Sequence, residues 1–170
     1  MEEFPSAIFQ MRRLSKLTLD GCSLKLFEVT AVGLSRIETL TRLNLANNPL
    51  TLAPHLGYMT GLTELMLSNA NISSVPSGVD KLWELGMVAL HDNNISDIGD
   101  ELFEIPDTQG LFVGLLGNPL SDVSKQRINQ YLENSSLDRK VEIQSEEVVL
   151  ESDSDSESSE SGFSTGSDSD

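Results

Sequence analysis

The side chains best suited to chemistry are few and scattered along this chain. There is one cysteine, Cys22, and the two histidines, His55 and His91, do not sit at a metal-ligand spacing. Gly114 and Gly117 belong to a repeated pattern and do not form a phosphate-cradling loop. Carboxylates are plentiful, but the sequence ties none of them to a base, a nucleophile or a metal. The sequence therefore predicts no catalytic residue, no metal site and no cofactor, and we expect the protein not to be an enzyme.

A leucine pattern repeats five times along the chain. The elements that it predicts must therefore position any residues that bind a partner. Its form is Leu-x-x-Leu-x-Leu-x-x-Asn-x-Leu, and the copies begin at Leu14, Leu40, Leu62, Leu85 and, in degenerate form, Gly110. The Leu-x-Leu core is expected to be a short strand whose leucines point into a solenoid. The Asn can bond backbone groups in the turn that follows the strand, so stacked copies can form a ladder.

Two copies lack the Asn. Cys22 takes its place in the first copy, where the pattern accepts Asn or Cys, so a structural role is favoured over a catalytic one. Ala70 takes its place in the third copy and cannot make the amide bonds. We therefore expect either that Asn69 or Asn71 shifts to help, or that this rung of the ladder is weaker.

This pattern is the one typical of leucine-rich repeat proteins, which implies an α/β fold. The expected architecture is a repeat solenoid with a parallel sheet on its concave face. Residues 1–120 hold about five repeats, residues 121–137 a capping helix, and residues 138–170 a disordered tail rich in Ser, Asp and Glu. No N-terminal cap is evident, so Phe4, Ile8 and Phe9 are expected to leave an apolar end exposed.

The charge is strongly negative and uneven. The net charge is -16, and residues 141–170 hold ten acids with no Lys or Arg, which accounts for -10 of it. Such a chain is not expected to bind nucleic acid through bulk electrostatics. The acidic start lacks the basic region of a secretory signal, and no apolar run is long enough to span a membrane. We expect a soluble, cytoplasmic protein without a membrane partner.

The residues beside the inward leucines should face the concave side, and we expect protein binding there. This face is graded, with charged and polar residues toward the N-terminal end and apolar residues toward the C-terminal end. The predicted partner-binding residues are Lys16, Arg42, Glu64, Met66, Met87, Phe112 and Leu116. The four apolar members would form one exposed patch. The alternative is that the C-terminal helix or the segment Val148–Leu150 folds over this patch.

Two further resemblances bear on function. Leu116-Gly-Asn-Pro-Leu-Ser121 and the Lys125–Tyr131 segment after it resemble the end of the repeat array in type III-secreted ubiquitin-ligase effectors of bacteria. That resemblance implies a substrate-binding half, delivered to a host cell, without the ligase domain. The alternatives are a fragment of a larger ligase, or an acidic chaperone that binds basic proteins through its tail, as in the acidic leucine-rich nuclear phosphoproteins. In each case the expected partner is a protein, whose identity the sequence does not reveal.

Overall fold

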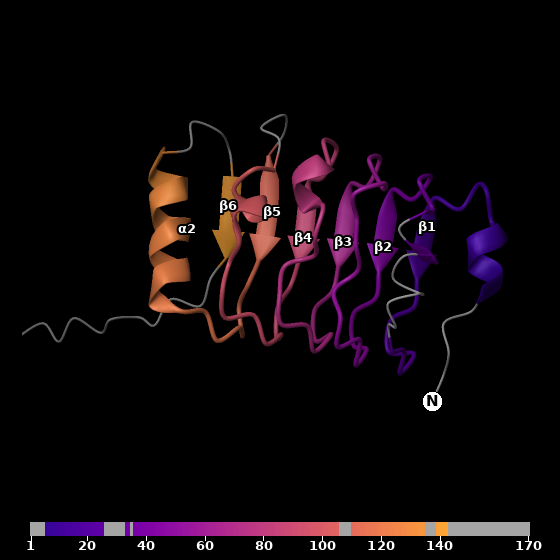
Figure 1. Ribbon diagram of the computed structural model, residues 1–170, viewed down its shortest axis with the longest axis horizontal. Coiled ribbons are helices and arrows are strands. Elements are labelled where there is room, and N and C mark those ends of the chain that lie inside the picture. The colour runs from indigo at the N-terminus through magenta and orange to yellow at the C-terminus, as the bar shows by residue number, and fades with distance from the viewer. Residues whose placement is uncertain (1–5, 26–32, 35, 106–109, 135–138, 143–170) are drawn as a thin grey trace, which may run out of the picture.

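The computed structural model describes residues 6–25, 33–34, 36–105, 110–134 and 139–142. Six strands form one sheet in chain order, and every neighbouring pair is parallel (Figure 1). The strands are β1 (Lys16–Thr18), β2 (Arg42–Asn44), β3 (Glu64–Met66), β4 (Met87–Ala89), β5 (Leu111–Gly114) and β6 (Arg139–Glu142). Three 3-10 helices, η1 (Ser6–Gln10), η2 (Val79–Lys81) and η3 (Asp100–Leu102), and one α-helix, α2 (Asp122–Asn134), complete the described elements. The predicted solenoid, with its parallel sheet and C-terminal helix, is confirmed.

The repeated leucines build the core. The central residue of each of the first four strands is buried, and Val113 fills the same place in β5. Side chains alternate across a strand, so the residues on either side of each buried one face outward. Leu65, Val88 and Val113 are fully buried and belong to this core.

One backbone position explains a column of small polar residues. The residue just before the ladder position has a positive φ in all five repeats, between 50° and 75°. Gly, Asn and Asp tolerate this left-handed conformation better than other residues do. The residues at this position are Gly21, Asn47, Asn69, Asp92 and Gly117.

The ladder asparagines tie each turn of the solenoid to the preceding one. Asn48, Asn93 and Asn118 are all buried. Asn48 Oδ1 accepts a bond of 2.9 Å from the backbone N–H of Leu24, and Asn118 Oδ1 accepts one of 3.1 Å from Ile95. Each amide also donates to backbone carbonyls of its own turn and of the preceding one. The predicted ladder is therefore present at these three positions.

At Ala70 the expected inward shift of a neighbouring Asn is absent, and the expectation of a weaker rung stays a prediction. Asn69 and Asn71 do not shift inward: their side chains lie at the surface, where they bond Asn47 and Asn94. The backbone replaces the missing amide, because the Leu50 N–H donates to the Ala70 carbonyl at 3.0 Å.

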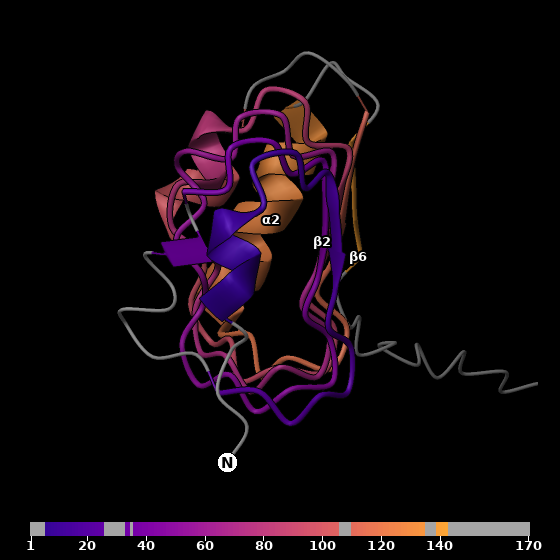
Figure 2. The ribbon, with the colours of Figure 1, turned by 90° about the vertical axis from the view of Figure 1, so that its right-hand side faces the viewer.

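Helix α2 closes the C-terminal end of the coil. Viewed along the solenoid, it lies inside the outline of the turns (Figure 2). Ile128 is fully buried, and the hydroxyl of the buried Ser124 accepts a bond of 3.0 Å from the Ile98 N–H. Arg127 donates to the Ile98 carbonyl at 2.7 Å, pairs with Asp100, and lies 4.8 Å from the centre of a Phe ring, that of Phe103.

Both expected ends of the fold need correction. Ile8 is buried, because η1 lies over the N-terminal end of the coil (Figure 2). Phe9 remains 38% exposed, and Phe4 lies outside the described residues. At the other end, the predicted tail boundary at residue 138 comes too early, since β6 pairs with the free edge of β5 and extends the sheet. The predicted disorder of the remaining tail falls outside the described residues.

Candidate functional site

Strand register places six of the seven predicted site residues, all but Leu116, in two straight columns on the outer face of the sheet. The first column pairs Lys16 with Arg42, Arg42 with Glu64, Glu64 with Met87, and Met87 with Phe112. The second column runs through Thr18, Asn44, Met66, Ala89 and Gly114. Neighbouring strands lie about 4.8 Å apart, so residues that follow one another in a column are adjacent in space.

The N-terminal half of this face is polar and slightly hollowed. Arg42 Nη2 lies 2.9 Å from Glu64 Oε1, and the two side chains are 52% and 26% exposed. Lys16 makes no ion pair with any other residue that the structure describes. A hollow of about 180 Å³ is lined by Lys16, Thr18, Arg42, Leu43, Asn44, Glu64 and Met66. The predicted residues Lys16, Arg42 and Glu64 are thus brought together around this hollow.

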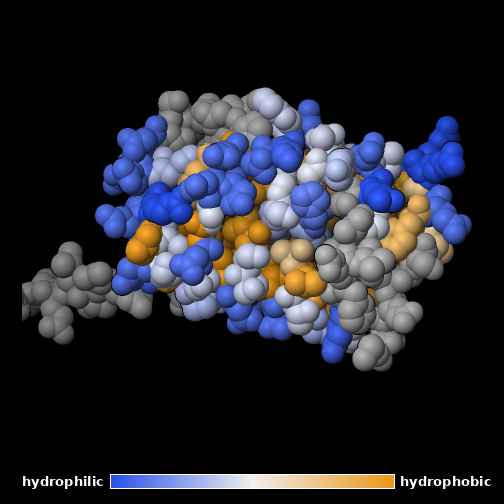
Figure 3. Space-filling view, viewed as in Figure 1, coloured by the Kyte–Doolittle hydropathy of each residue, from blue (hydrophilic) through white to orange (hydrophobic). Residues whose placement is uncertain are grey.

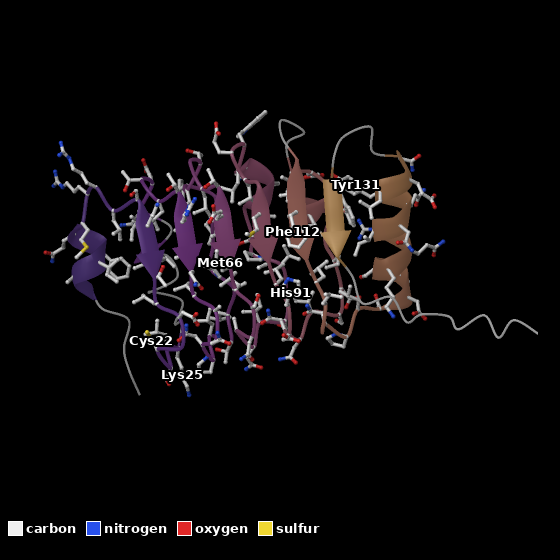
Figure 4. All side chains as sticks on the ribbon, turned by 180° about the vertical axis from the view of Figure 1, so that it is seen from behind. Cys22, Lys25, Met66, His91, Phe112 and Tyr131 are labelled. Carbon is white, nitrogen blue, oxygen red and sulfur yellow. The ribbon has the colours of Figure 1, made fainter. Side chains whose placement is uncertain are left out.

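The C-terminal half carries the other predicted residues. Met66, Met87 and Phe112 are half-buried on successive strands, and Leu116, just after β5, is 40% exposed. Met66 and Phe112 can be followed on the sheet face in Figure 4. We call these four residues the apolar patch. The predicted site residues therefore lie on one continuous face, with ionic contacts at one end and apolar side chains at the other.

Helix α2 does not cover the apolar patch. It packs at the end of the coil against Ile98, Phe103 and the last strand, and its ring contact is between Tyr131 and Phe103, whose centres are 5.2 Å apart. One of the two covering segments considered from sequence is thereby excluded. The other, Val148–Leu150, lies outside the described residues.

His91 lies beside this face and is not among the partner-binding residues predicted from the sequence. Its half-buried ring lies over Gly114: a Cβ on Gly114 would come within 2.1 Å of His91 Nε2. Gly114 therefore makes room for the imidazole between the strands and the turn. The signal in the sequence is Gly114 itself, because the other residues of its column, such as Asn44 and Met66, carry side chains.

The last strand changes the predicted grading of the face. Lys140 is in register with Phe112, and Glu142 is in register with Gly114. The columns thus continue past the apolar patch with two charged residue types, so the patch has charge-bearing register positions on both sides. Sequence reasoning missed them because they follow a helix and match no leucine pattern.

The returns between strands carry exposed aromatic residues away from this face. Tyr58, between β2 and β3, and Trp83, between β3 and β4, are each 60% exposed. The side of the molecule opposite the sheet shows hydrophilic residues with apolar residues between them (Figure 3). Tyr58 and Trp83 provide matched controls for substitutions in the patch.

The described residues contain little that suggests a reaction. Among them, no three His, Cys, Asp or Glu side chains gather as a metal site. Cys22 is a free thiol whose Sγ lies 3.4 Å from the Asp20 carbonyl in its turn, which agrees with the predicted structural role. No helix in the described part of the chain is both long and apolar enough to cross a bilayer.

Known proteins share parts of this architecture. Residues 39–59 match the family model described as Leucine Rich Repeat. The chain is 33% identical over 114 residues to decorin of Rattus norvegicus, in an alignment that covers 63% of this chain and 32% of decorin. A solved leucine-rich repeat protein of Leptospira interrogans shares 19% identity and a TM-score of 0.43, over 83% of this chain and 52% of that one. The chain thus spans about a third of decorin and about half of the Leptospira protein.

The chain folds as a leucine-rich repeat solenoid. Its consensus positions, its parallel sheet and the matched repeat all agree on this point. Leucine-rich repeat proteins generally mediate protein–protein interactions and are typically non-catalytic, and their curved solenoids offer extended concave surfaces for the purpose. The likeness to secreted ligase effectors stays a prediction.

Proposed function

We propose that this protein is a non-catalytic recognition module that binds a protein partner on the outer face of its sheet. The observation that supports the proposal is the strand register, which puts Met66, Met87 and Phe112 on three successive strands of one face, with Leu116 two residues after β5. Scattered apolar residues at a surface are ordinary, but a gathered patch is typical of an interaction site. Met and Phe are also enriched at protein interfaces.

Packing alone does not account for these side chains. The inward residues of the same strands, Leu65, Val88 and Val113, are fully buried and form the core on the other side of the sheet. Met66 and Met87 are only half-buried on that outer face. Polar residues at these positions would leave the core intact, so their apolar character fits contact with a partner.

The polar half would orient the partner. Arg42 and Glu64 form a partly exposed ion pair, and Lys16 stands beside them on the neighbouring strand. Exposed pairs of this kind contribute about 0–1 kcal/mol, so we expect this half to affect alignment and specificity more than affinity.

The test compares two double variants of the full chain. Peptides selected from a random display library on the wild-type protein are measured against Met87→Ser/Phe112→Ser and against the control Tyr58→Ser/Trp83→Ser. Loss of a central anchor typically costs about 2 kcal/mol or more, so affinity for the patch variant should fall at least about 30-fold. The control variant should bind as the wild type does.

Thermal unfolding of the same variants separates binding from folding. Truncations in a core cost about 2–5 kcal/mol each, whereas residues on an open face cost much less. If the thermal unfolding midpoint of the patch variant falls by as much as truncation in the core predicts, the patch belongs to the folded core. Equal peptide affinity for both double variants would overturn the proposal.

At a finer level, we propose that the module is the substrate-binding part of an effector-like protein, acting in the cytoplasm of a host cell. The support is the sequence Leu116-Gly-Asn-Pro-Leu-Ser121, which α2 follows directly. Ser121 precedes the helix, and its Oγ accepts a hydrogen bond of 3.3 Å from the Ser124 N–H. The neighbouring coding sequence tests this proposal. An adjacent frame for a helical domain with a reactive cysteine would instead indicate a fragment of a ligase.

A further inference from the structure

The chain leaves the sheet beside the apolar patch. Strand β6 is the neighbour of β5, and its Lys140 is in register with Phe112. The residues that follow β6 are Ile143-Gln-Ser-Glu-Glu-Val-Val-Leu150. Five residues, 143–147, therefore separate the short apolar segment Val148–Leu150 from a strand that borders the patch.

The distance is short enough for this segment to return to the patch. The middle of the patch lies between β4 and β5, about 7 Å across the sheet from β6 at a strand spacing of about 4.8 Å. The five residues 143–147 can span up to about 17 Å when extended. They can therefore turn out of β6 and place Val148–Leu150 over Met87 and Phe112.

Beyond the patch, the residues that follow Leu150 are opposite in charge to the basic residues on the face. Arg42 lies on β2, about 12 Å farther across the sheet, which an extended chain covers in about four residues. The acidic residues Glu151, Asp153 and Asp155 follow Leu150 at that range. Read from β5 toward β1, the face runs from the apolar patch to Arg42 and Lys16, and the chain after residue 147 runs from apolar to acidic.

We infer that Val148–Leu150 docks on the apolar patch of its own solenoid and directs the acids after it toward Arg42 and Lys16. The link from β6 is short, and short flexible links give effective concentrations on the order of millimolar. Even a weak contact is then occupied for much of the time. Because the inference places the tail on the face of the proposed function, a protein partner would have to displace it.

Acidic residues already on this face limit what the acids of the tail contribute. Glu64 is already paired with Arg42, and Asp20 accepts a bond of 2.8 Å from Asn47 Nδ2. Lys16 has no such pairing among the described residues, so it is the cation most open to a new acid. The apolar segment therefore provides the contact, and the acids set its direction.

A photo-cross-linker on the face tests the inference without any partner protein. In the full chain, Phe112→p-benzoylphenylalanine keeps an aromatic ring in the patch, and Trp83→p-benzoylphenylalanine is the control on a return. After irradiation of dilute protein, we expect the Phe112 probe to form cross-links within the monomer, and mass spectrometry should map them to residues 146–153. Adding Val148→Ser/Val149→Ser/Leu150→Ser should lower their yield at least about fivefold.

Three results would overturn the inference. The first is that the Phe112 probe cross-links only to other segments. The second is that the Trp83 probe cross-links to residues 146–153 in equal yield. The third is that the cross-linked product is only dimeric, which would indicate a second copy on the face. Peptide binding is measured separately, so the proposed function can fail while the tail still docks, and the reverse.

Discussion

Replacing Asn93 with alanine should destabilise this protein more than its size suggests. Asn93 is 4% exposed, and its Oδ1 accepts bonds from the N–H groups of Ala70 at 3.0 Å and Ile72 at 3.2 Å. Its Nδ2 donates to the carbonyls of Leu67, Leu90 and His91 at 2.8, 3.0 and 3.1 Å. One amide thus joins the third and fourth turns of the solenoid.

The magnitude follows from the groups left behind. Asn93→Ala leaves two buried N–H groups without their side-chain acceptor, and each buried donor without a partner costs about 1–3 kcal/mol. The Leu90 carbonyl keeps a bond from Asn118 Nδ2 at 2.8 Å, so the carbonyls add less. We expect the free energy of unfolding to fall by about 2–5 kcal/mol.

Urea unfolding followed by circular dichroism measures this loss, with Asn94→Ala as the matched control. Asn94 is exposed, and its side chain bonds only the Asn71 side chain among the described residues, so its loss should cost less than about 1 kcal/mol. Asn93→Asp keeps the acceptor but turns a carboxylate oxygen toward three carbonyls, and should cost at least as much as alanine. A loss at Asn93→Ala no larger than at Asn94→Ala would refute the reasoning.

Three further substitutions probe other parts of the solenoid. Gly117→Ala should lower the free energy of unfolding by about 1–2 kcal/mol in urea melts, because φ is +75° and the new Cβ would meet Asp92 Oδ1 at 2.2 Å. Gly114→Ala should shift the NMR signals of the His91 ring with little change in stability, since that ring can rotate away; unchanged signals would contradict the placement. Arg127→Ala should cost about 1–3 kcal/mol and speed hydrogen exchange in α2, and unchanged exchange would mean that this side chain does not hold the helix.

The repeat positions could be predicted because packing leaves them few options. The inward positions must be apolar to fill the coil, and the position before the ladder must accept a positive φ, as Asn47 and Asp92 do. These demands recur in every turn, so they appear in the sequence as a period. The strand register and the membership of the outer face follow from the same period.

What the sequence did not reveal depends on contacts that occur only once. Strand β6 has no leucine pattern, and it forms because the free edge of β5 offers unpaired backbone groups to a nearby segment. The cover at the N-terminal end depends on η1 placing Ile8 over the coil. The position of His91 depends on the absence of a side chain at Gly114. None of these contacts repeats from turn to turn, so none of them produces a repeated pattern in the sequence.

The same distinction separates structural residues from functional ones on this sheet. A position that every turn must fill in the same way, such as Leu65 or Val88, is explained by the core alone. The outer face carries no such demand, so the shift from Arg42 and Glu64 to Met87 and Phe112 along one column has no cause inside the solenoid. Contact with a covering surface is the cause that we propose. Because β6 continues that column, the proposed tail contact and the proposed partner site would share one surface, and competition between them would make binding adjustable by the charge of the tail.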